Sequence, residues 1–342
     1  MKAPPPFAPG AVRKKRIRVL SIDGGGIRGI IPAMVLAELE ARLETPVSRL
    51  FDLIVGTSTG GILALALTRP NEDGQPLYTA RELVDLYERE GANIFTRSTW
   101  HRIRALGSMV EERYTSRGIE EVLERYLGEA RLKDALTDVL IPSYEIERRM
   151  PFFFRSRRAR ERPDYDFFMR DVARATSAAP TYFEPHKIEV EGDPLDYYAL
   201  VDGGVYANNP AMCAFAEART VDPEAEILLV SLGTGELTRP IPYDDAKGWG
   251  LIQWAQPILG VVFDGVSDTV DYQLEHLLNG RSTRRQRYYR FQTRLDEGND
   301  DMDDASRTNL RALKLLAEDL IQRNKRPIAA LCRQLSRELQ PA

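Results

Sequence analysis

Cysteine and histidine are both scarce in this chain of 342 residues, which contains two cysteines and three histidines. Cys213 and Cys332 form no metal-binding or redox spacing, and we expect both to be reduced core residues of a cytoplasmic protein. A catalytic triad that depends on an imidazole has only three candidates, His101, His186 and His276. None of them follows a strand and a glycine turn that would present its side chain at a sheet edge, so we do not expect them to be catalytic.

Long apolar runs are also missing. No stretch approaches the ~18 apolar residues that cross a bilayer, so any membrane contact is expected to be peripheral. Residues 1–16 carry prolines where a secretory signal has its apolar segment, and they end in a basic cluster, Arg13–Arg16. We interpret residues 1–16 as a flexible tail. The alternative is weak attachment to an anionic surface, worth at most about 1 kcal/mol per basic residue.

The composition is that of an ordinary globular protein. A net charge of -4 gives no general attraction to nucleic acid. With 43% hydrophobic residues, the chain can form one large α/β domain or two small ones. Apolar runs alternate with glycine turns and helical patterns, for example at Arg18–Ile22, Leu53–Val55, Tyr197–Val201 and Ile227–Leu232. This alternation predicts a mainly parallel central sheet flanked by helices.

The segment Phe51–Leu67 places the pattern Gly-x-Ser-x-Gly between a predicted strand and a predicted helix. Gly56 and Gly60 flank Ser58, as a turn requires when it is too sharp for side chains on either side of the serine. The pattern is that of a nucleophile elbow, which exposes the serine Oγ at the N-terminus of a helix. The alternative is a glycine-rich turn between strand and helix that has no chemical role.

A second glycine turn, Asp23–Gly29, follows the first predicted strand and leads into a helix. Its glycines match the G-x-G-x-x-G pattern of dinucleotide-binding folds, and Glu44 lies near the usual position of the ribose-binding acid. The chain could then be a nucleotide-binding module. However, Glu44 follows a helix and not a second strand. The alternative is an oxyanion hole, which fits acyl transfer better because both glycine turns would lie at the carboxyl edge of one parallel sheet.

A serine hydroxyl needs a base to become a good nucleophile. Asp202 ends a predicted strand and precedes the turn Gly203–Gly204, so by alternation it should lie at the same edge as Ser58. The order Ser58, Asp202, His276 would also fit a Ser-Asp-His hydrolase. The alternative role for Asp202 is to form the turn through its own backbone.

Three motifs in this order resemble those of the patatin-like phospholipase family: Asp23-Gly-Gly-Gly-Ile-Arg-Gly29, Gly56-Thr-Ser-Thr-Gly60 and Asp202-Gly-Gly204. The similarity includes flanking segments such as Ala173–Pro180 and covers residues 18 to about 235. It implies a three-layer patatin-like α/β fold. It also implies phospholipase A-type hydrolysis of fatty-acyl esters by a Ser-Asp dyad through an acyl-serine, without metal or cofactor.

By this resemblance, Ser58 is the nucleophile and Asp202 the general base. The oxyanion hole would comprise Gly24, Gly25, Gly26 and Arg28, with Arg28 bracing the loop or the phosphate. The third motif of the family often ends in alanine, and Gly204 is a small departure from it. Because aspartate is a weak base in water, burial must raise the pKa of Asp202.

The chain is expected to divide into a Pro-rich basic tail (1–16), a catalytic domain (17–235) and a C-terminal extension (236–342) packed on that domain, which could act as a lid or regulatory region. Phospholipid would be the substrate, and no nucleic acid polymer is expected. Some bacterial members are antiviral effectors activated by cyclic dinucleotides, and Arg281–Phe291 could bind the phosphates of such an activator. The acidic run Asp300–Asp304 lacks the pattern of a calcium loop and is predicted to cap the helix that follows.

Overall fold

The computed structural model describes residues 15–94, 117–180, 182–190, 193–237, 240–254, 257–280, 285–295 and 301–339. Most of the predicted tail lies outside the described residues, as does His101. Arg16, assigned to that tail from the sequence, instead begins the first strand. None of the described helices is long and apolar enough to cross a membrane.

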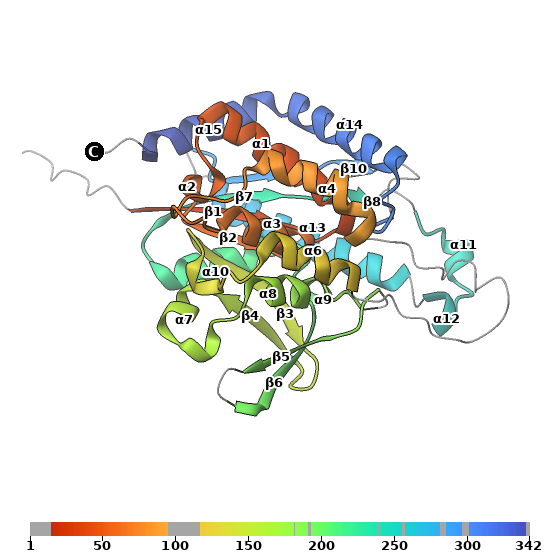
Figure 1. Cartoon of the computed structure of the whole chain (residues 1–342). Coiled ribbons are helices and arrows are strands. Elements are labelled where there is room, and N and C mark those ends of the chain that lie inside the picture. The colour runs from red at the N-terminus through yellow and green to blue at the C-terminus, as the bar shows by residue number, and fades with distance from the viewer. Residues whose placement is uncertain are drawn as a thin grey trace, which may run out of the picture.

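The central sheet follows the order β5-β6-β3-β2-β1-β7-β9, and β4 pairs with β3 outside this path (Figure 1). Five neighbouring strands, β3, β2, β1, β7 and β9, run parallel, which confirms the predicted mainly parallel sheet. Their bounds are β1 (Arg16–Ile22), β2 (Leu53–Gly56), β3 (Asp138–Glu145), β7 (Glu226–Leu232) and β9 (Tyr288–Phe291). The remaining strands pair antiparallel: β4 (Met150–Arg155), β5 (His186–Val190) and β6 (Asp193–Asp202). A separate pair is formed by β8 (Glu236–Leu237) and β10 (Arg294–Leu295).

Helices cover both faces of this sheet: α1 (Ile30–Leu43), α2 (Val47–Leu50), α3 (Thr59–Thr68), α4 (Ala80–Ile94), α6 (Arg117–Leu127), α7 (Ser156–Glu161), α8 (Met169–Thr176), α9 (Gly204–Ala207), α10 (Ala211–Val221), α13 (Pro257–Leu278), α14 (Arg307–Arg323) and α15 (Lys325–Leu339). Two short helices, α11 (Tyr243–Ala246) and α12 (Leu251–Trp254), lie away from the sheet (Figure 1). Short 3-10 turns lie at Gly26–Gly29, Leu132–Asp134 and Pro163–Tyr165.

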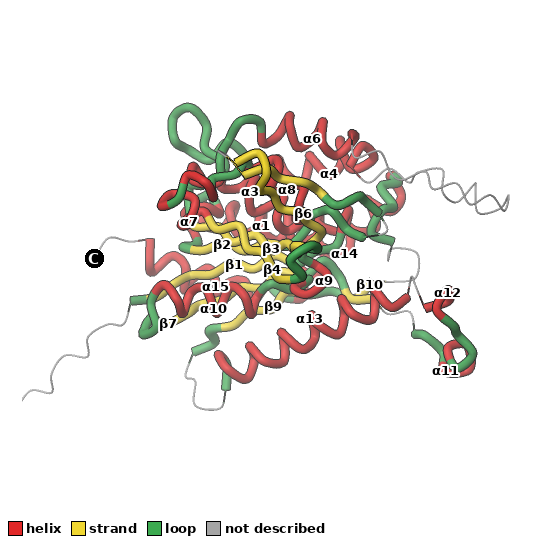
Figure 2. Tube along the Cα trace, turned by 90° about the horizontal axis from the view of Figure 1, so that it is seen from below, coloured by secondary structure: helices red, strands yellow, loops and turns green. Residues whose placement is uncertain are grey.

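Alternate residues of the strands point into two separate cores, as a pleated sheet requires. In β1, Leu20 and Ile22 belong to the core shared with α1, α3, α4 and α8. Ile17 and Val19 belong to the opposite core, which α10 and α13 cover (Figure 2). The protein therefore has three layers, helices–sheet–helices.

The residues after 236 share this architecture with the rest of the chain. β9 extends the central sheet beside β7, and α14 and α15 pack against α1 (Figure 1). The C-terminal extension is thus built into the same sheet and the same core as the region that carries the three motifs.

Candidate active site

Ser58 lies at a strained turn between β2 and α3, as the elbow pattern predicts. Its backbone has φ 54° and ψ -124°, a conformation that non-glycine residues rarely adopt and that clusters at active sites. A Cβ atom on Gly56 would lie 2.1 Å from the carbonyl oxygen of Gly60. A Cβ atom on Gly60 would lie 2.3 Å from the carbonyl oxygen of Ile22. Both glycines are therefore needed for the close approach of backbone on either side of the serine.

Hydrogen bonds from neighbouring elements hold this turn in place. The Ser58 N–H donates to Thr176 Oγ1 at 3.0 Å, and that hydroxyl donates to the Pro142 carbonyl at 2.6 Å. Thr57 Oγ1 donates to the Ala207 carbonyl at 2.7 Å. The turn is thus connected to α8, to β3 and to the segment that follows Asp202.

The strand arrangement that brings Asp202 close to Ser58 differs from the one predicted from the sequence. β2 pairs with residues 138–140 of β3, and β6 pairs with residues 143–145. Because β4 pairs with residues 140–145 on the other edge of β3, β2 and β6 must share one edge. β6 runs antiparallel to β3, so β2 and β6 end opposite each other across Pro142. The prediction of a shared location was right, but its basis in parallel alternation was wrong.

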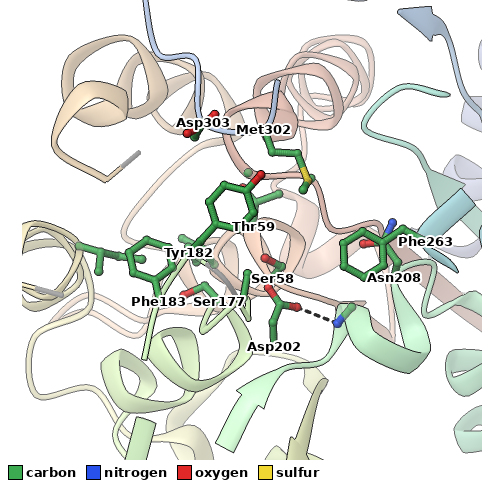
Figure 3. A pocket seen from close by; sticks show the side chains of 16 residues that line it. Ser58, Thr59, Ser177, Tyr182, Phe183, Asp202, Asn208, Phe263, Met302 and Asp303 are labelled. Carbon is green, nitrogen blue, oxygen red and sulfur yellow. Dashed lines mark hydrogen bonds between the residues drawn. The ribbon is translucent and has the colours of Figure 1, made fainter. Parts of the chain in front are cut away.

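The Asp202 carboxyl group is nearly inaccessible to solvent, with the residue 4% exposed. Oδ1 accepts the Gly204 N–H at 2.7 Å, and the Ser58 hydroxyl points toward the carboxylate (Figure 3). Burial raises the pKa of Asp202 to about 7, although hydrogen bonds from Ser58 and Gly204 act in the opposite direction. A carboxylate with a pKa near neutrality is suited to accept a proton from a hydroxyl.

The glycine loop between β1 and α1 lies directly against the serine. A Cβ atom on Gly24 would lie 3.3 Å from Ser58 Cβ. The N–H groups of Gly25 and Gly26 donate to no described residue. The Gly24 N–H, in contrast, donates to the Asn208 carbonyl at 3.0 Å. Gly24 is therefore not an oxyanion donor, which corrects the prediction, because its N–H is already occupied.

Arg28 braces the loop, as one of its two predicted roles requires. Its Nε donates to the Gly25 carbonyl at 3.2 Å, and the residue is buried. On the other side of the loop, Thr234 Oγ1 donates to the Gly24 carbonyl. The Gly24 and Gly25 carbonyl groups are thus held by hydrogen bonds, and the Gly25 and Gly26 N–H groups are left to bind an anion.

A cavity of about 50 Å³ opens above Ser58 and Asp202. Most of its wall is apolar, with side chains from α3, α6, α13 and the segments after α8 and before α14 (Figure 3): Ile62, Ile119, Tyr182, Phe183, Phe263 and Met302. Asn208 and Asp303 are polar members of the lining. An apolar cavity beside a serine and a carboxyl group fits an acyl chain better than a nucleotide.

Sequence reasoning missed the part of this wall that comes from the C-terminal extension. Met302 and Asp303 belong to the acidic run that was predicted to cap α14. The N-cap of α14 is instead Ser306, whose Oγ accepts the Asn309 N–H at 3.2 Å, while Asp304 accepts the Ser306 N–H. That prediction was wrong because Ser306, two residues closer to the helix than Asp304, occupies the N-cap position. No local pattern in the sequence marks Met302 or Phe263 as cavity residues.

The two histidines within the described residues do not line the cavity. His276 lies in α13, where its Nδ1 is 2.7 Å from the Tyr272 carbonyl oxygen. His186 begins β5 and lies 3.7 Å from Asp171. The structure therefore brings a carboxyl group, and neither of these imidazoles, to Ser58.

Glu44 and Arg281–Phe291 are the two features that the sequence suggested for binding other ligands, a nucleotide and a cyclic dinucleotide. Glu44 is the C-cap of α1, a helix of 14 residues, so it lies about 20 Å from the glycine loop at the other end. It cannot bind the ribose of a nucleotide held at that loop. Within Arg281–Phe291, Arg287 donates to the Leu278 carbonyl, and Arg290 is paired with Asp23. Activation by a cyclic dinucleotide stays an untested prediction.

Comparison with known proteins identifies similar chains. The family model described as patatin-like phospholipase matches residues 20–215. Patatin-like protein 4 of Arabidopsis thaliana is 33% identical, over 90% of this chain and 84% of that protein. Probable inactive patatin-3-Kuras 1 of Solanum tuberosum is 34% identical, over 90% of this chain and 87% of that protein. The solved structure of VipD from Legionella pneumophila aligns at 13% identity, over 90% of this chain and 67% of that chain. Its TM-score of 0.34 is too low to support a structural argument.

Proposed function

Since the chain belongs to the patatin-like phospholipase family, we propose that it is a phospholipase A that uses Ser58 and Asp202. Membership of this family supports lipid acyl hydrolysis in general. The observation that carries the finer proposal is the approach of a buried carboxyl group to a serine on a strained turn, at the base of an apolar cavity. One relative is named as probably inactive, so activity has to be tested on this chain itself.

In the proposed reaction, Ser58 Oγ attacks the carbonyl carbon of a fatty-acyl ester while Asp202 accepts the hydroxyl proton. The Gly25 and Gly26 N–H groups stabilise the tetrahedral oxyanion, and each such donor typically contributes about 3 kcal/mol in the transition state. The intermediate collapses, and Asp202 returns the proton to the departing alcohol oxygen of the lysophospholipid. Water then attacks the acyl-serine with Asp202 as its base, which releases the fatty acid and restores Ser58.

The direct test is the release of fatty acid from defined phospholipids by the wild-type protein. The rival hypothesis, a nucleotide-binding module without catalysis, predicts calorimetric binding of NAD or ATP and no cleavage of phospholipids or p-nitrophenyl esters. Release of fatty acid that depends on Ser58 would reject this rival. Nucleotide binding without release would reject the proposal.

The pH dependence of hydrolysis should report Asp202. Because the base must be ionised and its pKa lies at about 7, kcat/KM for a soluble ester is expected to rise with pH to half of its maximum near pH 7. At pH 5 it should be about a hundredfold below the plateau, since activity falls tenfold per pH unit on this limb. Initial rates of p-nitrophenyl butyrate hydrolysis between pH 5 and 9 measure this. A profile that stays flat down to pH 5 would exclude Asp202 as the base.

We also propose that the start of α13 is the contact with a lipid surface. Ile258, Val261 and Val262 are 42%, 47% and 38% exposed, and the next residue, Phe263, lines the cavity. Aspartate at both valines should weaken binding to phosphatidylcholine vesicles at least about tenfold, because apolar area is lost and charge is added. Hydrolysis of p-nitrophenyl butyrate should be unchanged. Cosedimentation with vesicles measures the binding.

The matched control for that experiment is Leu315→Asp, which alters a side chain in α14 that is 58% exposed. It should bind vesicles as the wild-type protein does. Equal loss of binding in both variants would show that the contribution of α13 is not specific.

A further inference from the structure

A buried ion pair joins the C-terminal extension to the start of the glycine loop. Arg290, in β9, donates through Nη1 to Asp23 Oδ1 at 3.0 Å and through Nη2 to Asp23 Oδ2 at 2.6 Å. The two side chains are 12% and 2% exposed. Nη1 also donates to Ser231 Oγ at 2.8 Å. The contact is bidentate and almost dehydrated, which is the strongest geometry for arginine and carboxylate.

Asp23 is the residue directly before the glycines that present the two available N–H groups. Its own N–H donates to the Leu232 carbonyl at 3.0 Å, so its backbone and its side chain are both fixed. At the far end of the glycines, the Ile27 N–H donates to the Met302 carbonyl at 2.9 Å. Arg290 and Met302 both follow residue 236. The loop is therefore anchored on both sides by the extension, which contains none of the three motifs.

We propose that Arg290 is a positioning residue for acyl transfer, which acts through Asp23 to fix the orientation of the Gly25 and Gly26 N–H groups. This inference rests on the proposed function, because only there do these groups have an oxyanion to bind. Without Arg290, the Asp23 carboxyl group would be buried and unpaired next to the loop, and the loop would have to move to hydrate it. Misplaced donors weaken binding of the transition state more than that of the substrate, so kcat should fall and KM should not.

The test compares the steady-state kinetics of the full-length variant Arg290→Gln and the wild-type protein on p-nitrophenyl butyrate. The measurements are made well below the melting temperature of each. We expect kcat to fall ten- to a hundredfold while KM stays within threefold. The second variant, Arg290→Lys, keeps the charge but cannot contact both carboxylate oxygens and Ser231 together. Its kcat should fall at least threefold, and it decides the question if Arg290→Gln does not fold.

Lys133→Gln is the structural control, because Lys133 Nζ lies 2.9 Å from Asp166, another carboxylate whose side chain is 2% exposed. Asp166 lies before α8 and far along the chain from the three motifs, so this variant should lower the melting temperature and leave kcat unchanged. If the folded Arg290 variants behave in the same way, with kcat within twofold of the wild-type value, the ion pair is structural only and the inference is wrong.

Labelling of Ser58 by a fluorophosphonate separates this inference from the proposed function. A wild-type protein that is labelled at Ser58 and hydrolyses the ester supports the proposed function, whatever the Arg290 variants do. In that case slower labelling of Arg290→Gln, by the same factor as its loss of kcat, supports the positioning role. A wild-type protein that is neither labelled nor active overturns both.

Discussion

Replacement of Ser58 by alanine is expected to abolish fatty-acid release from phospholipids, with a loss of at least about 10⁴-fold in kcat. The hydroxyl is the proposed nucleophile, and the Thr59 and Ser177 hydroxyls that also line the cavity are hydrogen-bonded to the Tyr87 hydroxyl and the Ala173 carbonyl. Alanine meets the same backbone strain at φ 54° as serine does, so the melting temperature should change little. Release of fatty acid from phosphatidylcholine vesicles, measured by mass spectrometry, checks this prediction.

The controls for Ser58→Ala are His186→Ala and His276→Ala, which remove the described imidazoles. Both variants should retain the activity of the wild-type protein, because neither side chain lines the cavity. A histidine variant that is folded but inactive would replace the two-residue mechanism with a triad. Residual activity of Ser58→Ala near the wild-type rate would reject the proposed nucleophile.

Asp202→Asn should reduce kcat by about 10³- to 10⁴-fold, because the amide cannot accept the serine proton. The substitution keeps the size of the side chain and an oxygen that can accept the Gly204 N–H. The loss should therefore come from chemistry and not from the fold. Ester hydrolysis at pH 8, where the wild-type base is ionised, is the informative measurement.

The same variant should be more stable than the wild-type protein at high pH. Between the ordinary aspartate value of 3.8 and about 7, the pKa of Asp202 in the fold, the folded state keeps a proton that the unfolded chain has released. The free energy of unfolding of the wild-type protein therefore falls as pH rises through this range, by up to about 4 kcal/mol. Asparagine does not titrate, so the free energy of unfolding of the variant does not fall in this way.

Thermal denaturation of both proteins at pH 5 and pH 8 tests this linkage. The advantage of Asp202→Asn should be large at pH 8 and smaller at pH 5. A difference that does not depend on pH would show that burial does not raise the pKa of Asp202, and it would also weaken the case for this residue as a base.

The parts of the site that could be predicted from the sequence are those that a few consecutive residues determine. The elbow around Ser58 and the loop Asp23–Gly29 each follow a strand directly, and Gly56 is required by its contact with the Gly60 carbonyl within the elbow itself. The helix predicted directly after the second glycine turn is present as α1. These features depend on local sterics and on burial of one face, which leave a readable pattern.

The remaining features depend on packing between distant segments. Arg290 and Asp23 are separated by 267 positions, and an arginine among aromatic residues is equally compatible with a surface that binds phosphates. The occupied N–H of Gly24 could not be predicted either, because its acceptor, the Asn208 carbonyl, follows Asp202 in an unrelated turn. The location of Asp202 was predicted correctly only because an antiparallel strand and a parallel one can end at the same point.

The meeting of β2 and β6 along one edge of β3 limits how this protein can change during evolution. The separation between Ser58 and Asp202 is set by the few residues of β3 between Leu140 and Ser143. One insertion there would displace one group from the other by about 3.3 Å and turn the following side chains to the opposite face. Surface loops elsewhere can gain or lose residues freely, whereas this short stretch has to keep its length.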